Sequence, residues 1–255
     1  MEMRKSTIIS VTSVKGGSGK TINLLNLAGV YHKMGKKVLI IDLDLYSGDV
    51  SAILNANNSK DIYNIFEDIT NNNFKSIDNY IVNYNNSIDI IAAPKDPRYA
   101  SKVNGNLISV ILTKSENMYD VILIDTNHVL NVNNLIAFDK SSYILYVINN
   151  NSMNLKSMKT MVSIFNNIGK DNYKILLYEA TNSIRGFYSE LDIKTILKRN
   201  VDYTIPNTFF IKNIDKYILK GEILTLNKGY KMNKKVMNIY NSLALSLLEQ
   251  VKYEK

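Results

Sequence analysis

Short apolar runs alternate with amphipathic stretches along almost the whole chain. Runs rich in β-branched residues predict strands at 7–14, 36–44, 87–94, 119–125, 141–148, 173–178 and 201–206. Apolar residues spaced three and four apart predict helices at 21–34, 61–69, 74–82, 105–116, 158–165 and 236–251, with one more between the last two strands. Strands buried on both faces are nearly continuous apolar runs, so the alternation predicts an α/β fold whose mostly parallel sheet is covered by helices on both faces.

Composition favours one substantial core. The chain has 255 residues, 45% of them hydrophobic, with only 11 glycines and 3 prolines, so no stretch has the composition of a flexible linker. We therefore expect a single domain that covers residues 1–255.

The chain contains no cysteine, which excludes a disulfide framework, a thiolate metal site and a cysteine nucleophile. Its first residues lack the apolar core of a signal peptide, and its apolar runs stop before the roughly 18–20 residues that a membrane-spanning helix needs. These features predict a cytoplasmic protein without an integral membrane segment.

The formal net charge is +8, which favours an anionic partner such as nucleic acid. Lysines gather in the C-terminal third, at Lys212, Lys216, Lys220, Lys228, Lys231, Lys234 and Lys235. Two readings stay open: a surface that contacts DNA phosphates, or a solvated face in a lysine-rich proteome.

The segment 12–21, TSVKGGSGKT, lies between a predicted strand and a predicted helix. A glycine-rich loop between a strand and a helix is the structural context of a phosphate-binding loop (P-loop). Its glycines let backbone N–H groups turn inward around phosphate oxygens at the helix N-terminus. Lys20 is expected to reach the β- and γ-phosphates, and the Thr21 hydroxyl is expected to ligate Mg²⁺. The predicted nucleotide-binding residues are Gly16, Gly17, Ser18, Gly19, Lys20, Thr21 and Ile22.

The usual P-loop pattern fails at its first position, where this chain has Val14, and a second lysine follows at Lys15. The resulting KGGSGKT resembles the ParA/MinD family of deviant Walker ATPases. In that family two subunits enclose two nucleotides face to face, and the early lysine reaches the partner's phosphates. The resemblance implies a homodimer in the ATP-bound state and a catalytic role for Lys15; the alternative is a solvated loop lysine.

Carboxylates lie at the ends of two of the predicted strands. Asp42 and Asp44, two positions apart on one strand, are expected to lie on the same face. By resemblance, Asp42 lies near Mg²⁺, and Asp44 helps to place the attacking water. Asp125 ends the strand 119–125, where a Walker B carboxylate would hold Mg²⁺ through water.

The segments expected to bind the adenine base depart from the family pattern. TIPN, 204–207, resembles the segment near the adenine, which assigns Pro206 and Asn207 to nucleotide binding. However, Tyr178-Glu179 stands where the family commonly has Asn-Arg. The chain has no element that favours guanine, so ATP remains the expected nucleotide.

The switch segment after Asp125 also departs, since the family's Asp-x-Pro-x-Gly is replaced by 125–129, DTNHV. Two readings of His128 stay open, a residue that tunes the switch or an incidental loop histidine. His32 has no metal-ligand pairing.

Within the family, DLDLYSGDV (42–50) and AAPKDP (92–97) resemble the CpaE/TadZ pilus-assembly branch. This resemblance implies a slow Mg²⁺-dependent ATPase that positions a pilus or secretion apparatus, recruited by a partner to a cell pole or to the inner membrane face. Many members carry a receiver-like domain ahead of the ATPase, which we expect to be missing or encoded elsewhere.

Three other functions are weighed against this one. The first alternative is a ParA-type plasmid or chromosome partition ATPase that binds DNA nonspecifically, and the second is a non-catalytic nucleotide-binding scaffold. A MinD-like membrane protein is least favoured, because only the polar 252–255 follows the last predicted helix. Family members with iron–sulfur clusters are excluded because they need cysteines.

Overall fold

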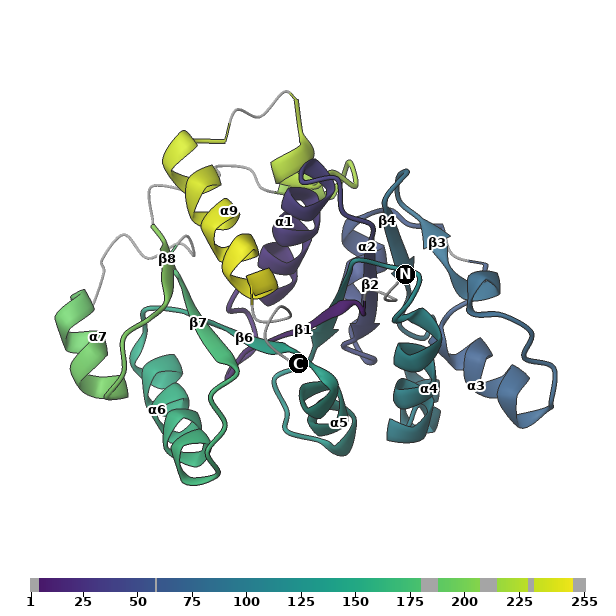
Figure 1. The fold of residues 1–255 in the computed structure, drawn as a ribbon, viewed down its shortest axis with the longest axis horizontal. Coiled ribbons are helices and arrows are strands. Elements are labelled where there is room, and N and C mark those ends of the chain that lie inside the picture. Colours follow the sequence, from purple (N-terminus) through teal and green to yellow (C-terminus); the bar gives the residue numbers. More distant parts are fainter. Residues whose placement is uncertain (1–4, 58, 180–187, 207–214, 229–231, 250–255) are drawn as a thin grey trace.

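The predicted strands form one eight-stranded sheet in the order β3-β4-β2-β5-β1-β6-β7-β8 in the computed structural model (Figure 1). The structure describes residues 5–57, 59–179, 188–206, 215–228 and 232–249. The strands are β1 (Thr7–Thr12), β2 (Val38–Leu43), β3 (Val82–Asn83), β4 (Ile88–Ile91), β5 (Val121–Thr126), β6 (Tyr143–Ile148), β7 (Tyr173–Tyr178) and β8 (Tyr203–Ile205). Among these strands, β3 pairs antiparallel with β4 and every other pair is parallel, so the predicted fold class is confirmed.

Helices cover both faces of the sheet (Figure 1). One face packs against α1 (Lys20–Lys33) and α9 (Lys234–Leu248), with α2 (Asp49–Ile53), α8 (Asp215–Ile218) and the 3₁₀ turn η4 (Leu224–Leu226) beside them. The opposite face packs against α3 (Ile62–Thr70), α4 (Gly105–Ser115), α5 (Val132–Lys140), α6 (Ser152–Asn167) and α7 (Glu190–Leu197), with two 3₁₀ turns, η1 (Ile77–Tyr80) and η2 (Pro97–Lys102).

The predicted helix at 74–82 is wrong. Only one 3₁₀ turn, η1, forms there, and the chain then pairs with β4 as the two-residue strand β3. Ser76 caps this turn by accepting from the Asp78 N–H, while Ile77 and Tyr80 enter the core. A single apolar turn gives the same local spacing as the start of a helix, so the pattern could not separate the two.

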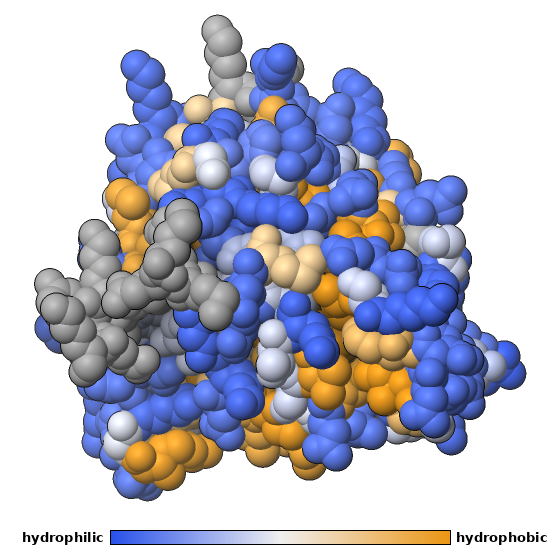
Figure 2. All heavy atoms as spheres, turned by 45° about the vertical axis from the view of Figure 1, so that its right-hand side comes forward, coloured by the Kyte–Doolittle hydropathy of each residue, from blue (hydrophilic) through white to orange (hydrophobic). Residues whose placement is uncertain are grey.

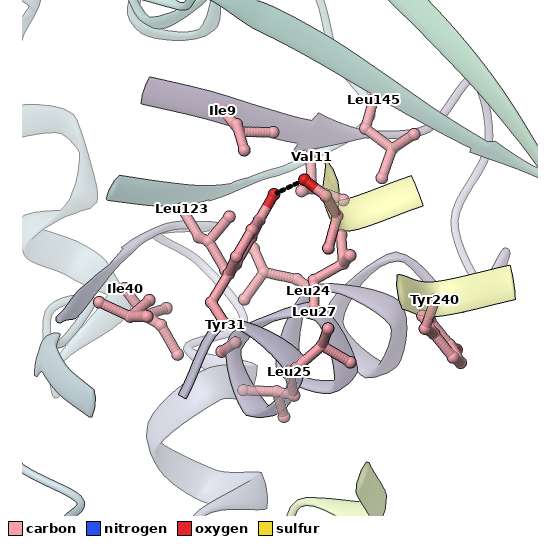
Figure 3. Packing of buried hydrophobic residues seen from close by; sticks show 14 of the residues in the cluster. Ile9, Val11, Leu24, Leu25, Leu27, Tyr31, Ile40, Leu123, Leu145 and Tyr240 are labelled. Carbon is pink, nitrogen blue, oxygen red and sulfur yellow. Dashed lines mark hydrogen bonds between the residues drawn. The ribbon is translucent and has the colours of Figure 1, made fainter. Parts of the chain in front are cut away.

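Helix α1 lies at the centre of the molecule, and its side chains are buried nearly all around from Thr21 to Tyr31. The sheet covers one side of α1, and α9 and η4 cover much of the rest. Tyr31 runs through this core, and its hydroxyl donates to the Ala244 carbonyl of α9 at 3.1 Å (Figure 3). Burial raises the pKa of the Tyr31 hydroxyl well above its ordinary value. This hydroxyl therefore acts as a neutral donor that fastens α9 to α1.

A buried polar network joins α9 to the loop before α1. The Tyr240 hydroxyl donates to Asn23 Oδ1 at 2.7 Å, and Asn23 Nδ2 donates to the Gly19 carbonyl at 2.8 Å. Asn26 Nδ2 contacts the same hydroxyl at 3.4 Å, and Asn26 Oδ1 accepts from the Thr225 N–H at 3.2 Å. Buried polar groups hold their geometry when they are mutually satisfied, so this network positions the P-loop from behind.

One face of the molecule is mainly polar (Figure 2). Figure 2 shows one face on which hydrophilic residues predominate, with apolar residues gathered in separate patches between them. In the described part of the chain, no helix is both long and apolar enough to cross a bilayer.

Candidate functional site

The strand order explains why distant residues meet. Strands β2, β5 and β1 are neighbours, and parallel pairing brings their carboxyl ends to the same edge of the sheet. Asp42 of β2 is the direct register partner of Asp125 of β5, and the P-loop leaves the end of β1 beside them. Ligands of open parallel sheets bind at this kind of edge, where connections leave to opposite sides.

The P-loop takes backbone conformations that require glycine. Gly17 and Gly19 have φ angles of +73° and +88°. A Cβ on Gly19 would lie 2.6 Å from Cδ1 of Tyr178, so the tyrosine ring fills the space beside this glycine. Gly19 also caps α1, leaving the first N–H groups of a 14-residue helix at the loop. The predicted P-loop is confirmed as a loop between β1 and α1, built to accept an anion.

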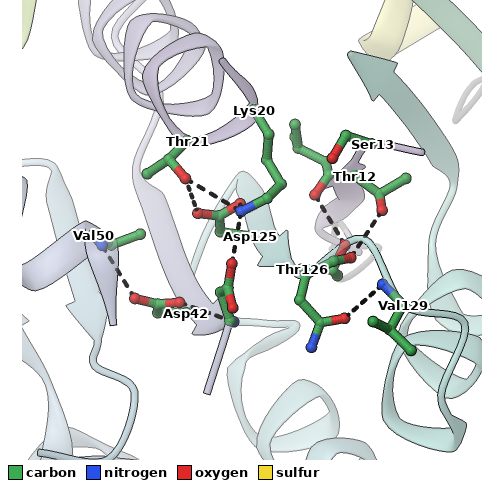
Figure 4. Close-up of polar contacts among 12 residues, drawn as sticks. Thr12, Ser13, Lys20, Thr21, Asp42, Val50, Asp125, Thr126 and Val129 are labelled. Carbon is green, nitrogen blue, oxygen red and sulfur yellow. Dashed lines mark hydrogen bonds and ion pairs between the residues drawn. The ribbon is translucent and has the colours of Figure 1, made fainter. Parts of the chain in front are cut away.

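Lys20 lies at the first turn of α1, and its ammonium group contacts two carboxylates (Figure 4). Lys20 Nζ is 3.1 Å from Asp44 Oδ2 and 3.1 Å from Asp125 Oδ1. Burial on its own would lower the pKa of Lys20, but the charges of Asp125 and Asp44 outweigh burial and raise this pKa above its ordinary value. The lysine is therefore a fixed cation between the ends of β2 and β5.

Asp125 is completely buried and lies between the lysine and a hydroxyl. The Thr21 hydroxyl donates to Asp125 Oδ2 at 2.7 Å, and Lys20 neutralises Oδ1 (Figure 4). Burial raises the pKa of the Asp125 carboxyl to about 6, against the lowering effects of Lys20 and Thr21. The structure thus brings together Lys20, Thr21 and Asp125 as the sequence predicted.

The prediction that Asp42 and Asp44 lie on the same face of one strand is wrong, because β2 ends at Leu43 and Asp44 lies outside it. The Asp44 N–H donates to Asp42 Oδ1 at 3.0 Å, and the Val50 N–H donates to Asp42 Oδ2 at 3.2 Å. Burial raises the pKa of Asp42 well above its ordinary value, and the charge of Asp125 adds to the shift. Asp42 therefore bridges β2 to α2, while Asp44, one residue past the strand, turns its carboxylate to Lys20.

Lys15 contrasts with Lys20. Its side chain is exposed and forms no ion pair with any residue that the structure describes. The Ser13 hydroxyl donates to the Lys15 carbonyl at 2.8 Å and holds the backbone, leaving the side chain to solvent.

The switch segment after β5 is anchored by side-chain amides in place of proline and glycine. Asn127 Oδ1 accepts from the Val129 N–H at 2.9 Å and from Asn134 Nδ2 at 2.9 Å. Asn134 Nδ2 also contacts the Asn127 and Val129 carbonyls, at 3.2 and 2.6 Å. Asn134 belongs to α5, a helix that the hydrophobic pattern did not reveal in this asparagine-rich stretch.

One cavity of about 590 Å³ joins these parts, a size common for small-molecule sites. The P-loop residues 16–22, Asp44 and the switch residues 127–129 line it. Sequence reasoning missed the rest of the lining, which consists of Tyr46, Ser47, Asp49, Ile53 and Ile218. Tyr46, 66% exposed in a polar segment, gave no signal; Ile53 and Ile218 come from short helices brought in by the fold.

The base side of the site is described only in part. Pro206 directly follows β8 and is half-buried, and Asn207 lies outside the described residues. Tyr178 packs beside Gly19, and Glu179 accepts from Asn150 Nδ2 at 3.2 Å. These two residues therefore have structural partners of their own.

The oxygen donors suit Mg²⁺ with a nucleotide. No group of three or more His, Cys, Asp or Glu side chains able to hold a metal occurs among the described residues. Mg²⁺ usually takes one or two protein oxygens together with phosphate oxygens and waters, and does not need an all-protein cage. A hydroxyl on Thr21 in contact with the Asp125 carboxylate fits that requirement.

Two relatives match parts of the chain. It is 39% identical over 61 residues to the uncharacterized ATP-binding protein MJ0924 of Methanocaldococcus jannaschii, covering 24% of this chain and 23% of that protein. It is 29% identical over 116 residues to the putative tyrosine-protein kinase CapB of Staphylococcus aureus, covering 46% of this chain and 50% of that protein. The matched segments span half or less of these relatives.

Solved structures match almost the whole chain in fold. A ParA family ATPase from Chlorobium tepidum has a TM-score of 0.79 at 17% identity and covers 95% of this chain and 98% of its own. The septum site-determining protein MinD of Pyrococcus horikoshii, complexed with Mg-ADP, has a TM-score of 0.75 at 22% identity, covering 98% and 100%. A putative plasmid partition protein of Borrelia burgdorferi bound to AMPPNP has a TM-score of 0.71 at 22% identity, covering 96% and 99%.

Residues 6–177 match the protein family AAA_31, described as an AAA domain. This match includes the P-loop and Asp44, which line the cavity, and the buried Asp42 and Asp125 at the neighbouring strand ends. The chain thus belongs to the AAA_31 family of ParA/MinD-type deviant Walker A ATPases.

Proposed function

We propose that this protein is a dimerising switch ATPase that binds ATP with Mg²⁺ and slowly hydrolyses it to ADP and phosphate. The contrast between its two P-loop lysines carries the proposal. Lys20 is held inside its own subunit by Asp44 and Asp125, whereas Lys15 is exposed at the mouth of the same loop.

The residues of the site have complementary tasks in this proposal. The P-loop N–H groups and Lys20 bind the phosphates, and the movement of Lys20 toward them releases the Asp44 carboxylate to orient a water molecule. Thr21 and Asp125, with Asp42 behind them, would hold Mg²⁺, which neutralises phosphate charge when bound. Lys15 of one subunit supplies a cation to the phosphates of the other.

A mixing experiment tests the shared site. Lys20→Ala should weaken nucleotide binding itself, whereas Lys15→Ala should bind ATP nearly as the unaltered protein does but turn it over more slowly. Cations delivered from a partner subunit accelerate hydrolysis by a factor on the order of 10³–10⁵ in related sites. We expect Lys15→Ala to lose less turnover than this, because the switch segment is atypical. Mixed Lys15→Ala and Lys20→Ala subunits form one site with both lysines, so activity should partly recover.

Equal loss of ATP binding in the two single variants would show that Lys15 acts in its own loop. Sedimentation of the protein with AMPPNP and Mg²⁺ gives an independent test. A protein that binds this nucleotide but stays monomeric, also as Asp44→Ala to block turnover, contradicts the shared site. Mg²⁺-dependent turnover that is lost in Lys20→Ala would reject the alternative of a non-catalytic scaffold.

For the cargo, we infer a partition-type role ahead of the pilus or secretion role that the CpaE/TadZ resemblance suggested. Support comes from the fold likeness to a ParA family ATPase and to a plasmid partition protein. Exposed lysines in the C-terminal third offer a surface for DNA phosphates: Lys216, Lys220, Lys228, Lys234 and Lys235. Lys212 and Lys231 lie outside the described residues.

DNA binding is tested by gel shift with AMPPNP and Mg²⁺ at low and moderate salt. Phosphate contacts predict retardation that weakens steeply as salt rises. The double substitution Lys234→Gln and Lys235→Gln at the start of α9 should weaken it, and the matched pair Lys156→Gln and Lys159→Gln on α6 should not. No retardation at low salt would leave the positioning of a protein apparatus as the better role.

A further inference from the structure

His128 stands out among the residues that line the cavity, because it is the tip of the anchored switch segment. Its neighbours on both sides are fixed, since Asn127 Oδ1 accepts from the Val129 N–H and Asn134 of α5 binds both residues. The His128 side chain itself is exposed and has no hydrogen-bond partner within the described part of the chain.

The imidazole faces the P-loop. Its Cε1 and Nδ1 atoms lie 4.0 Å from the point that a Cβ on Gly16 would occupy, and Gly16 carries no side chain to separate the ring from the loop. His128, Gly16 and Lys20 all line the same cavity. The ring is therefore within reach of a group bound against the outer side of the loop.

Lys20 indicates which part of a nucleotide lies there. A P-loop lysine reaches the β- and γ-phosphates. In this structure its ammonium group points to Asp44 and Asp125, at the ends of β2 and β5, and His128 belongs to the loop that leaves β5. The terminal phosphate thus falls on the side of the cavity where the imidazole is.

We propose that His128 binds the terminal phosphate of ATP within its own subunit and so distinguishes ATP from ADP before a second subunit arrives. An imidazole N–H donates to phosphate oxygens, a charge-assisted bond that ADP cannot form at this position. The inference rests on the proposed nucleotide-binding function and adds a residue that the P-loop motif does not contain.

The position of His128 also links nucleotide state to the surface. The residues that follow it expose large apolar side chains, Val129, Leu130 and Val132, and Val129 also lines the cavity. A bond from His128 to the terminal phosphate joins this segment to the nucleotide in the ATP-bound monomer, whereas ADP leaves the segment without that contact.

The experiment compares AMPPNP and ADP, each with Mg²⁺, at protein concentrations where sedimentation shows a monomer. We expect His128→Ala to lower AMPPNP affinity about tenfold, the effect of one hydrogen bond to a charged group, and to change ADP affinity less than twofold. His128→Gln, which keeps an N–H donor, should recover part of the loss. The matched control is His32→Ala, since His32 lies at the far end of α1 and contacts Ser87.

Nuclear magnetic resonance gives a second readout, because the chain has only two histidines. The His128 ring signals, assigned by their loss in His128→Ala, should shift with AMPPNP more than with ADP, while the His32 signals stay in place. Equal losses of affinity for both nucleotides, no loss for either, or unshifted His128 signals would overturn the inference. If the unaltered protein binds neither nucleotide, or Lys20→Ala binds both normally, the proposed function fails as well.

Discussion

Lys20, where the loop after β1 enters α1, directs its charge inward, whereas the loop after β5 presents apolar side chains outward. In the first, Lys20 at the start of α1 is held by Asp44 and Asp125. In the second, Val129 and Leu130 are 53% and 49% exposed, above a buried framework of asparagine side chains. Both loops line one cavity.

This difference separates binding from signalling. Buried charges must be paired, so the first loop can keep Lys20 and Asp125 together only while they neutralise each other or a ligand does. Exposed apolar side chains cost little free energy in a monomer, and they provide apolar contacts when a second protein surface covers them. The first loop is suited to hold phosphate, and the second is suited to report that phosphate is bound.

The largest expected effect comes from removing the inward charge. Lys20→Ala deletes the charge-assisted bonds to phosphate, and we expect nucleotide affinity to fall on the order of 10²–10³-fold, as two such bonds imply. Titration calorimetry with ADP and Mg²⁺ measures this change. Lys15→Ala is the control, and a comparable loss there would erase the distinction between the two lysines.

The shape of the first loop comes next. Gly19→Ala places a Cβ 2.6 Å from the Tyr178 ring at a φ of +88°, so we expect a loss of unfolding free energy of about 2–3 kcal/mol. Gly17→Ala is the matched control, because Gly17 also has a positive φ, +73°, but a Cβ there meets nothing within 4 Å. Its cost should be about 1–2 kcal/mol, from the backbone alone. Equal urea midpoints for the two variants would contradict a tight contact with Tyr178.

The buried carboxylate predicts a pH dependence of the nucleotide-free protein. The pKa of Asp125 is raised to about 6, so the folded state binds a proton more tightly than the unfolded chain does. Its contribution therefore lowers stability as pH rises from about 4 to about 6, by on the order of 3 kcal/mol, and the loss is complete above that range. Urea unfolding at several pH values measures this slope, and Asp125→Asn should reduce it, while the raised pKa of the buried Asp42 leaves a remaining slope of the same sign. An unchanged slope in that variant would assign the dependence to other groups.

The smallest effect concerns the framework of the second loop. Asn134→Ala removes the amide that donates to Asn127 and Val129, and we expect a cost of about 1 kcal/mol in unfolding free energy. Because the loop is then less ordered, AMPPNP-dependent dimerisation should weaken as well.

Asn133→Ala is the control for that prediction, since Asn133 on the same helix donates to the Val103 carbonyl, which lies outside the switch segment. It should lower stability by a similar amount without changing dimerisation. If both variants dimerise as the unaltered protein does, the asparagine framework has no part in the switch.

The sequence predicted much of this molecule because the relevant signals are local. KGGSGKT between a β-branched run and an apolar helix specifies a P-loop, since its glycines, Lys20 and Thr21 act within a few residues of one another. Continuous apolar runs predicted a buried parallel sheet. The carboxylate of Asp125, at the end of the run 119–125, predicted a polar group at the edge of that sheet where the strands end. The prediction of a helix at 74–82 failed because the apolar residues of one 3₁₀ turn have the same spacing as those of the first turn of a helix.

Only the tertiary structure decided which of these residues touch. Thr21 and Asp125 are 104 positions apart, and the strand order β2-β5-β1 places them in contact. The packing of Tyr178 beside Gly19, the hold of Asn134 on the switch and the approach of His128 to Gly16 depend on elements that no local pattern links. Residue type and spacing determine what chemistry a segment can offer, whereas sheet order and side-chain packing determine which segments share a site.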